Sequence, residues 1–123
     1  MIPRRLVRTL ARAGLAATFV HGGYRAAQDP GDRPAKAASL GLPEDPRLVR
    51  ANGAAMVVGG VALTLGIFPR LAAAGLIASL VPTSAAGHPF WRDADPAVRA
   101  QHLGQTLKHL GLVGGLLLVA TDR

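Results

Sequence analysis

Long uncharged, mostly apolar runs alternate with short charged segments along the chain. Residues 51–68 form one such run and residues 71–87 form another, with only Pro69 and Arg70 between them. Each run is close to the length of about 20 residues that an α-helix needs to cross a bilayer. Because so short a link leaves room only for a tight turn, the pattern predicts two antiparallel helices that lie back to back.

Two further helices are expected outside this central pair. The first spans residues 3–27, where Arg8 and Arg12 lie one turn apart and can extend to lipid headgroups. The last spans residues 96–120 and carries no charge in its final turns. The predicted helices therefore cover residues 3–27, 46–68, 70–88 and 96–120.

Turn-forming residues mark the connections. Residues 28–45 contain three prolines, two glycines and charges of both signs, which is typical of a solvent-facing segment, with a short turn of helix expected over residues 35–40. An aspartate followed by a proline is a strong helix-start signal, because aspartate caps free backbone N–H groups and proline fits the first helical position. The chain carries this signal before the second and the last predicted helix, at Asp45–Pro46 and Asp95–Pro96.

The composition favours packed helices over sheets. Half of the 123 residues are hydrophobic, aromatic residues make up 4%, and there are 15 glycines. Glycine and alanine allow membrane helices to approach closely, and small residues recur every four positions at Ala51, Ala55 and Gly59, at Ala74 and Ala78, and at Gly111 and Gly115. The predicted fold class for the single domain, residues 1–123, is all-α: a four-helix up-down-up-down transmembrane bundle.

The charge pattern identifies the lipid bilayer, rather than nucleic acid, as the expected partner. A net charge of +7 can reflect phosphate binding, but the basic residues lie at the edges of the apolar runs, where they meet anionic headgroups. The absence of cysteine excludes disulfides, thiolate nucleophiles and iron–sulfur ligation. Helix faces of small residues suit other membrane subunits or a second copy of this chain.

An even number of spans places both termini on one side of a plasma membrane. Counting basic residues does not decide which side, because six lie on the terminal side, including Arg70 and Arg123, and eight lie on the other. The arginines that open the first helix weigh most under the positive-inside rule and favour the cytoplasm. They are Arg4, Arg5, Arg8 and Arg12.

Polar side chains gather at the end of the predicted bundle opposite the termini. Alternating helix directions bring two helix starts and two helix ends to one depth there. We expect a ligand pocket at this end, in which charge-assisted hydrogen bonds hold an anionic or carbonyl-bearing headgroup. Its predicted residues are Arg50, Asn52, His88, Trp91 and Lys108. In the alternative arrangement, Arg50 and Lys108 meet lipid headgroups or loop carboxylates, and Trp91 is an interfacial anchor.

The sequence offers no catalytic constellation and no metal site. Ser79, Thr83 and Ser84 lack a positioned base and acid, and hydroxyls in membrane helices usually bond a carbonyl one turn back. Histidines invite a haem or metal hypothesis, but no His-x-x-x-His or Glu-x-x-His spacing occurs, and the apolar runs contain no carboxylate. The four histidines are His21, His88, His102 and His109.

The chain resembles the DoxX family of membrane proteins, in its small actinobacterial form, over nearly its whole length. The resemblance rests on LARAGLAATFVHGGYRA in the first helix and LVRANGAAMVVGGVALTLGIFPRLAA across the second and third. It continues through PTSAAGHPFW and a lysine-containing last helix that ends in GLLLVA. The HPFW element and the FPRLAA turn are its most specific parts. Where family members often have asparagine after the lysine of the last helix, this chain has His109.

The resemblance implies a four-helix plasma-membrane protein. The family takes its name from a small subunit associated with thiosulfate-to-quinone electron transfer, and its relatives are described as redox-associated or accessory. Three functional classes follow: a noncatalytic subunit or accessory protein of a quinone-linked redox assembly, a binder or carrier of a quinone or lipid, and a self-sufficient oxidoreductase. The missing cysteines and intramembrane carboxylates make the third class the weakest. No cofactor is expected apart from a bound quinone or lipid.

Overall fold

The protein is helical throughout the residues that the structure describes. The structure, a computed structural model, describes residues 2–88, 90–92 and 94–122. Within these ranges it contains five α-helices, one 3₁₀ helix and no strand, which confirms the predicted all-α class. In chain order they are α1 (Arg4–Gln28), α2 (Arg33–Ala38), α3 (Pro46–Leu65), α4 (Pro69–Gly87), η1 (Phe90–Arg92) and α5 (Pro96–Ala120). Arg123, counted above for the orientation, lies outside the described residues.

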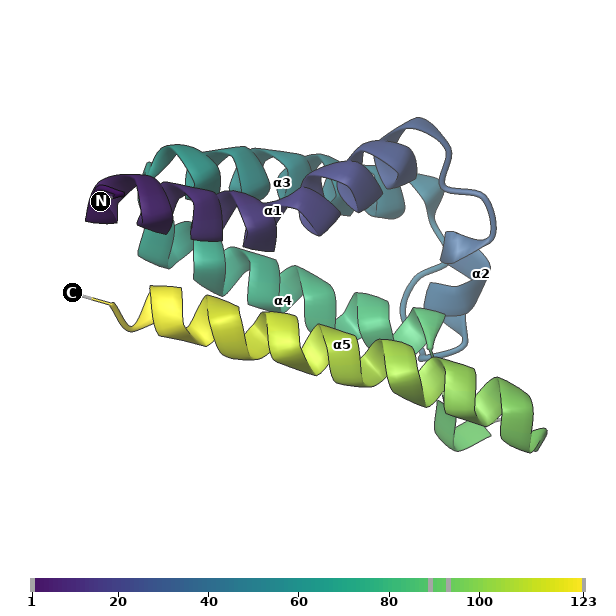
Figure 1. Ribbon diagram of the computed structural model, residues 1–123. Helices are drawn as coiled ribbons and strands as arrows, with labels where there is room; N and C mark the ends of the chain where they lie inside the picture. Colours follow the sequence, from purple (N-terminus) through teal and green to yellow (C-terminus); the bar gives the residue numbers. More distant parts are fainter. Residues whose placement is uncertain (1, 89, 93, 123) are drawn as a thin grey trace.

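Four long helices lie side by side, and consecutive long helices run in opposite directions (Figure 1). α3 packs against both α1 and α4, and α4 packs against α5, whereas α1 and α5 have little contact. The short helix α2 covers one end of the molecule, where it packs on α3 and α4. Both termini lie at the opposite end (Figure 1). The structure thus has one short α-helix besides the four long ones, and it overlaps the short turn of helix expected over residues 35–40.

Local capping residues set the helix ends. Asp45 and Asp95 each accept a hydrogen bond of 2.9 Å from the backbone N–H two residues later, so both predicted start signals act as caps. The second predicted helix ends at Leu65 rather than at residue 68, because Gly66 takes a left-handed conformation with φ of 74° that terminates α3. The remaining predicted helix boundaries agree with the structure to within one residue.

The core is small and takes one large side chain from each long helix. Phe19 of α1, Leu63 of α3, Leu76 of α4 and Leu116 of α5 are each no more than 1% exposed. Complete burial of one such side chain stabilises a folded protein by about 1.5–3 kcal/mol. The other buried residues of the same core cluster are Ala16, Met56, Ala73 and Leu80. This single cluster therefore joins all four long helices.

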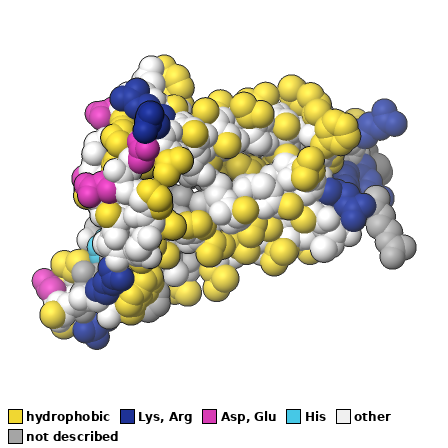
Figure 2. Space-filling view, turned by 180° about the vertical axis from the view of Figure 1, so that it is seen from behind, with side chains coloured by type: hydrophobic (Ala, Val, Ile, Leu, Met, Phe, Trp, Pro, Cys, Tyr) yellow, Lys and Arg dark blue, Asp and Glu magenta, His cyan; other side chains and the backbone are white. Residues whose placement is uncertain are grey.

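Most other large apolar side chains lie on the outside of the molecule. Val58, Leu71 and Leu118 are 69%, 72% and 75% exposed. On the face shown in Figure 2, charged side chains gather at the two ends, and the band between them is hydrophobic or uncharged. Among the described helices, α3 and α5 are long and apolar enough to cross a membrane. An apolar band between charged ends is the surface expected of a protein in contact with lipid.

Two facing glycines bring α1 and α3 close together. A Cβ atom added to Gly23 would lie 2.5 Å from the carbonyl oxygen of Gly53, and one added to Gly53 would lie 2.5 Å from the carbonyl oxygen of Gly23. The predicted small-residue stripe of α3 does not make this contact, since Ala51 and Ala55 are exposed. A larger residue at either glycine must push the two backbones apart.

Gly23→Ala is expected to destabilise the protein by about 1–3 kcal/mol, because the added methyl separates α1 from α3. Gly53→Ala should act in the same direction. Gly22→Ala is the matched control, since nothing lies within 4 Å of a Cβ atom at Gly22 and alanine has the higher helix propensity. Unfolding midpoints in mild detergent compare the three variants. Equal midpoints for Gly22→Ala and Gly23→Ala would contradict this packing.

Candidate functional site

Three histidines meet at the end of the molecule that α2 covers. His88 caps the C-terminus of α4, where its backbone N–H donates to the carbonyl oxygen of Ser84 at 2.8 Å. His102 and His109 lie on α5, which runs antiparallel to α4 and packs against it. The end of α4 and the first half of α5 thus form a histidine cluster of His88, His102 and His109. The fourth histidine, His21, is exposed on α1.

His88 lies next to both other rings of the histidine cluster. The Nδ1 atoms of His88 and His102 are 3.0 Å apart, so one ring donates a hydrogen bond and the other accepts it. The centroid of the His88 ring lies 5.2 Å from that of His102 and 5.3 Å from that of His109. Because an accepting nitrogen must be unprotonated, this hydrogen bond requires at least one neutral ring.

Hydroxyl groups of α4 and α5 complete the network around these rings. Ser84 is 9% exposed, and its Oγ atom lies 2.7 Å from Nδ1 of His109. The Thr106 hydroxyl donates to the carbonyl oxygen of His102 at 3.0 Å and lies 3.5 Å from that of His88. A buried hydroxyl that keeps its hydrogen bond avoids the desolvation penalty of an unpaired polar group. Ser84 and His109 therefore link α4 to α5.

A small cavity lies beside the histidine cluster. Its volume is about 200 Å³. Ser84, Thr106, His109 and Trp91 bring polar or aromatic groups to its wall, and the apolar lining residues are Leu80, Val81, Ala85, Leu110 and Val113. Ligand pockets in proteins usually measure about 300–1,000 Å³. This cavity can therefore take a small headgroup, but not a whole lipid.

Burial and neighbouring positive charge lower the pKa of His88. The pKa lies below the ordinary histidine value of about 6.5, and loss of hydration around the charged ring is the largest cause. Repulsion from His109, His102 and Lys36 lowers the pKa further. Near neutral pH the His88 ring is therefore neutral, with one nitrogen able to donate a hydrogen bond and the other able to accept one.

The five residues predicted to bind a ligand lie in different surroundings. Trp91 of η1 lines the small cavity, and His88 belongs to the histidine cluster beside it. Asn52 of α3 accepts a hydrogen bond of 2.7 Å from the hydroxyl of Ser79 on α4. Asn52 thus connects two helices, and it is not among the residues that line the cavity.

Arg50 and Lys108 line neither this cavity nor the histidine cluster. Both residues are exposed. Neither forms a hydrogen bond or an ion pair with any residue that the structure describes. Their exposure fits the alternative arrangement, in which long basic side chains extend to lipid headgroups. The structure does not bring all five predicted residues to one cavity, and ligand binding by them stays a prediction.

Ser84, Thr106 and His109 line the cavity although the sequence did not identify them as ligand-binding residues. A partial signal was present, because His102, Thr106 and His109 are spaced at i, i+4 and i+7 and share one face of a helix. Ser84 has no such signal. Its partner His109 is 25 residues away in the chain, so only the pairing of α4 with α5 brings the two together.

The histidine cluster can exchange hydrogen bonds and protons. Among the described residues, no group of three His, Cys, Asp or Glu side chains is arranged to hold a metal ion. Nδ1 of His109 is engaged by Ser84, and the Nδ1 atoms of His88 and His102 are engaged by each other. Histidine rings change protonation near neutral pH. This end of the molecule is therefore suited to a polar headgroup and to a response to pH.

The stability of the protein in detergent is expected to fall as the pH drops below about 6.5. An unfolded His88 takes up a proton near this pH, whereas the folded environment opposes protonation through burial and through His109, His102 and Lys36. Folding is then favoured less at low pH. His88→Gln should reduce the change in unfolding midpoint between pH 7.5 and 5.5, and His21→Gln should leave it unchanged. An identical pH dependence of the unfolding midpoint in both variants would show that His88 does not cause the loss of stability at low pH.

Comparison with known proteins identifies one family. The family model described as DoxX matches residues 7–89. The matched part includes His88 but ends before His102 and His109 of α5. No curated protein and no solved structure matches the chain. Since the match extends over more than half of the 123 residues, the chain belongs to the DoxX family, a membrane-associated family often linked to redox-related function.

Proposed function

We propose that the protein is a noncatalytic integral membrane subunit, or accessory protein, of a redox-associated and quinone-linked assembly in the plasma membrane. In this proposal α1, α3, α4 and α5 form a four-helix up-down-up-down transmembrane bundle with both termini in the cytoplasm. The exposed apolar surface of the long helices is the observation that carries the proposal. Family membership supports the redox association.

The outer surface of α5 supports contact with lipid and with another subunit. In the apolar 18-residue stretch of α5 only 6% is buried within the chain, whereas the corresponding share for α3 is 22%. Its exposed side chains include Leu107, Leu110, Leu117 and Leu118. A continuous apolar surface of this kind is unfavourable in water and is typical of membrane or subunit contacts. We therefore expect a partner helix to pack on α5.

The lengths of α1 and α4 support their placement in the bilayer. α1 has 25 residues and α4 has 19. At about 1.5 Å per residue they measure about 37 Å and 28 Å, compared with a hydrocarbon thickness of about 30 Å. The longer α1 begins with arginines, whose side chains can reach the headgroup region.

The small cavity beside the histidine cluster favours a second function, binding of a quinone or lipid headgroup. Ser84, Thr106 and His109 supply hydrogen-bonding groups to a wall that is otherwise mostly apolar. A quinone carbonyl can accept hydrogen bonds from hydroxyl or imidazole donors of this kind. Its isoprenoid chain would have to lie outside the cavity, because about 200 Å³ holds only the ring.

Purification in mild detergent tests these functions together. A noncatalytic subunit should co-purify with stoichiometric partner subunits. Leu107→Trp should reduce this co-purification because it adds bulk to the exposed face of α5, and Val58→Trp on the exposed face of α3 is the matched control. A quinone that co-purifies at one molecule per chain without any partner would favour the second function. A chain that carries a bound absorbing chromophore and oxidises or reduces a substrate alone would contradict the noncatalytic proposal.

The proposed topology predicts opposite accessibility of the two ends of the molecule. The chain has no cysteine, so single-cysteine variants report one position each. Ser39→Cys beside α2 should react with a membrane-impermeant maleimide in intact cells, and Ile2→Cys should react only after permeabilisation. Both residues are exposed in the structure. The reverse result would invert the orientation, and reaction of both from outside would contradict the proposed crossing of the membrane by α1.

A further inference from the structure

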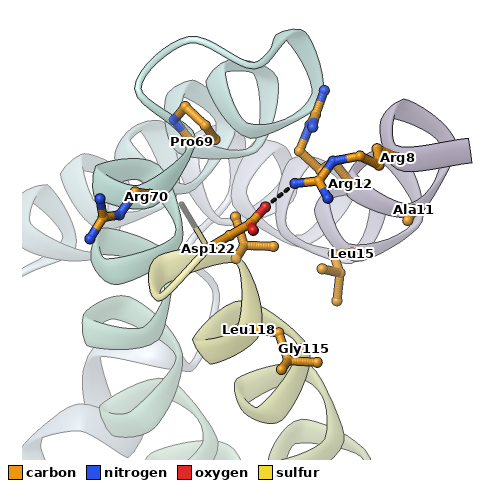
Figure 3. A pocket seen from close by; sticks show the side chains of 10 residues that line it. Arg8, Ala11, Arg12, Leu15, Pro69, Arg70, Gly115, Leu118 and Asp122 are labelled. Carbon is orange, nitrogen blue, oxygen red and sulfur yellow. Dashed lines mark hydrogen bonds and ion pairs between the residues drawn. The ribbon is translucent and has the colours of Figure 1, made fainter. Parts of the chain in front are cut away.

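A second and larger cavity lies at the end of the molecule where both termini meet. Its volume is about 580 Å³, which is within the usual range of ligand pockets. It is bounded by the first half of α1, the start of α4 and the end of α5 (Figure 3). Its polar and charged lining residues are Arg8, Arg12, Arg70 and Asp122.

The charges of this cavity do not balance. The described residues of its wall supply three guanidinium groups and one carboxylate, which together carry a net formal charge of +2. Asp122 forms an ion pair with Arg8, shown by the dashed line in Figure 3. Both side chains of this pair are 40% or more exposed, so the pair is accessible to an external competitor and is weak by itself.

The Arg12 side chain does not use all of its hydrogen-bond donors. Its Nε atom is buried and has no hydrogen-bond partner among the described residues. One terminal nitrogen lies 3.4 Å from the Thr9 hydroxyl, and the guanidinium also lies close to Gly66 at the end of α3. A buried donor without an acceptor is unfavourable, and more so on a charged group. Among the residues that the structure describes, no carboxylate therefore pairs with the Arg12 side chain.

Apolar walls extend from the arginines along the gap between α1 and α5. These two helices have little contact with each other. They approach at Gly115, where an added Cβ atom would lie 2.8 Å from Cδ2 of Leu15. The apolar residues that line the cavity include Ala11, Leu15, Leu118 and Val119. A ligand with a charged head and an apolar tail matches this arrangement.

Arg70 fixes one side of the cavity. Its Nε atom donates a hydrogen bond of 3.1 Å to the carbonyl oxygen of Ala120, the last residue of α5. This contact ties the start of α4 to the end of α5. The guanidinium keeps its charge at the cavity wall while it holds the helix end, so Arg70 also adds to the positive potential there.

We propose that this cavity binds the phosphate of an anionic phospholipid, with Arg12 and Arg8 as the principal phosphate ligands and the gap between α1 and α5 as the site of an acyl chain. The phosphate competes with the Asp122 carboxylate for Arg8. The inference that this phosphate belongs to a lipid rests on the proposed membrane placement of the helices. The site is separate from the histidine cluster, which lies at the other end of the molecule.

Native mass spectrometry of the full chain in detergent tests the proposal, with dioleoyl phosphatidylglycerol and dioleoyl phosphatidylcholine as probes. One molecule of phosphatidylglycerol should be retained in preference to phosphatidylcholine. Arg12→Gln should weaken its binding about tenfold, because one charge-assisted contact to phosphate is lost. Arg5→Gln removes the same charge from an exposed position of the same helix that does not line the cavity, and it should leave binding unchanged. Asp122→Asn should strengthen binding, because Arg8 loses its competitor.

The opposite effects of Arg12→Gln and Asp122→Asn separate a defined site from general attraction. Equal weakening by Arg5→Gln and Arg12→Gln would overturn the proposal, as would an absence of any effect of Asp122→Asn. Binding of inorganic phosphate as strong as that of phosphatidylglycerol would overturn the lipid as ligand. Arg12→Lys keeps the charge and should retain part of the affinity for phosphatidylglycerol. Retained binding in this variant would show that the loss in Arg12→Gln comes from the missing charge and not from misfolding. Co-purification of partner subunits is measured separately, so it can fail while lipid binding holds.

Discussion

The close approach of α1 and α3 at Gly23 and Gly53 is the contact on which the other helix positions depend. Backbone oxygens of each helix occupy the space where a side chain of the other would stand, and α1 and α3 share the most extensive helix contact of the described chain. α4 then follows α3 through the turn at Gly66, and α5 pairs with α4. Since α1 lies against α3 rather than α5, a gap is left between the first and last helices. The larger cavity occupies this gap.

The two ends of the molecule have different chemistry because different helix ends meet there. At the end covered by α2, the last turn of α4 faces the first half of α5, and neutral or weakly basic groups come together in the histidine cluster. At the terminal end, the start of α1 faces the end of α5 and the start of α4, and arginines meet a single aspartate in the cavity wall. The first end is expected to respond to pH through His88, whereas the arginines of the second carry permanent charge. An apolar band separates them on the face shown in Figure 2.

The small core and the apolar exterior have one physical explanation in a membrane protein. Lipid solvates apolar side chains, so the helices gain little by burying them against one another and associate through close packing and hydrogen bonds instead. The hydrogen bond from Ser79 to Asn52 and that between Ser84 and His109 are contacts of this type. They join α3 to α4 and α4 to α5. The exposed leucines of α5 remain available to lipid or to another subunit of an assembly.

The sequence by itself determined the four long helices, their order and most of their ends, because the length of an uncharged run and an Asp-Pro cap act over a few neighbouring residues. It also indicated the membrane family through local motifs. The positions of the helices relative to one another were decided only by the tertiary structure. Ala51, Ala55 and Gly59 formed the more regular stripe, yet Gly53 faces α1. Arg50 and Lys108 were predicted to line the ligand pocket, yet both are exposed. Alanine and glycine are so frequent in these helices that many faces look equally suited to packing. Helix rotation was therefore decided by partners distant in the chain, as when Ser84 met His109 and Arg8 met Asp122.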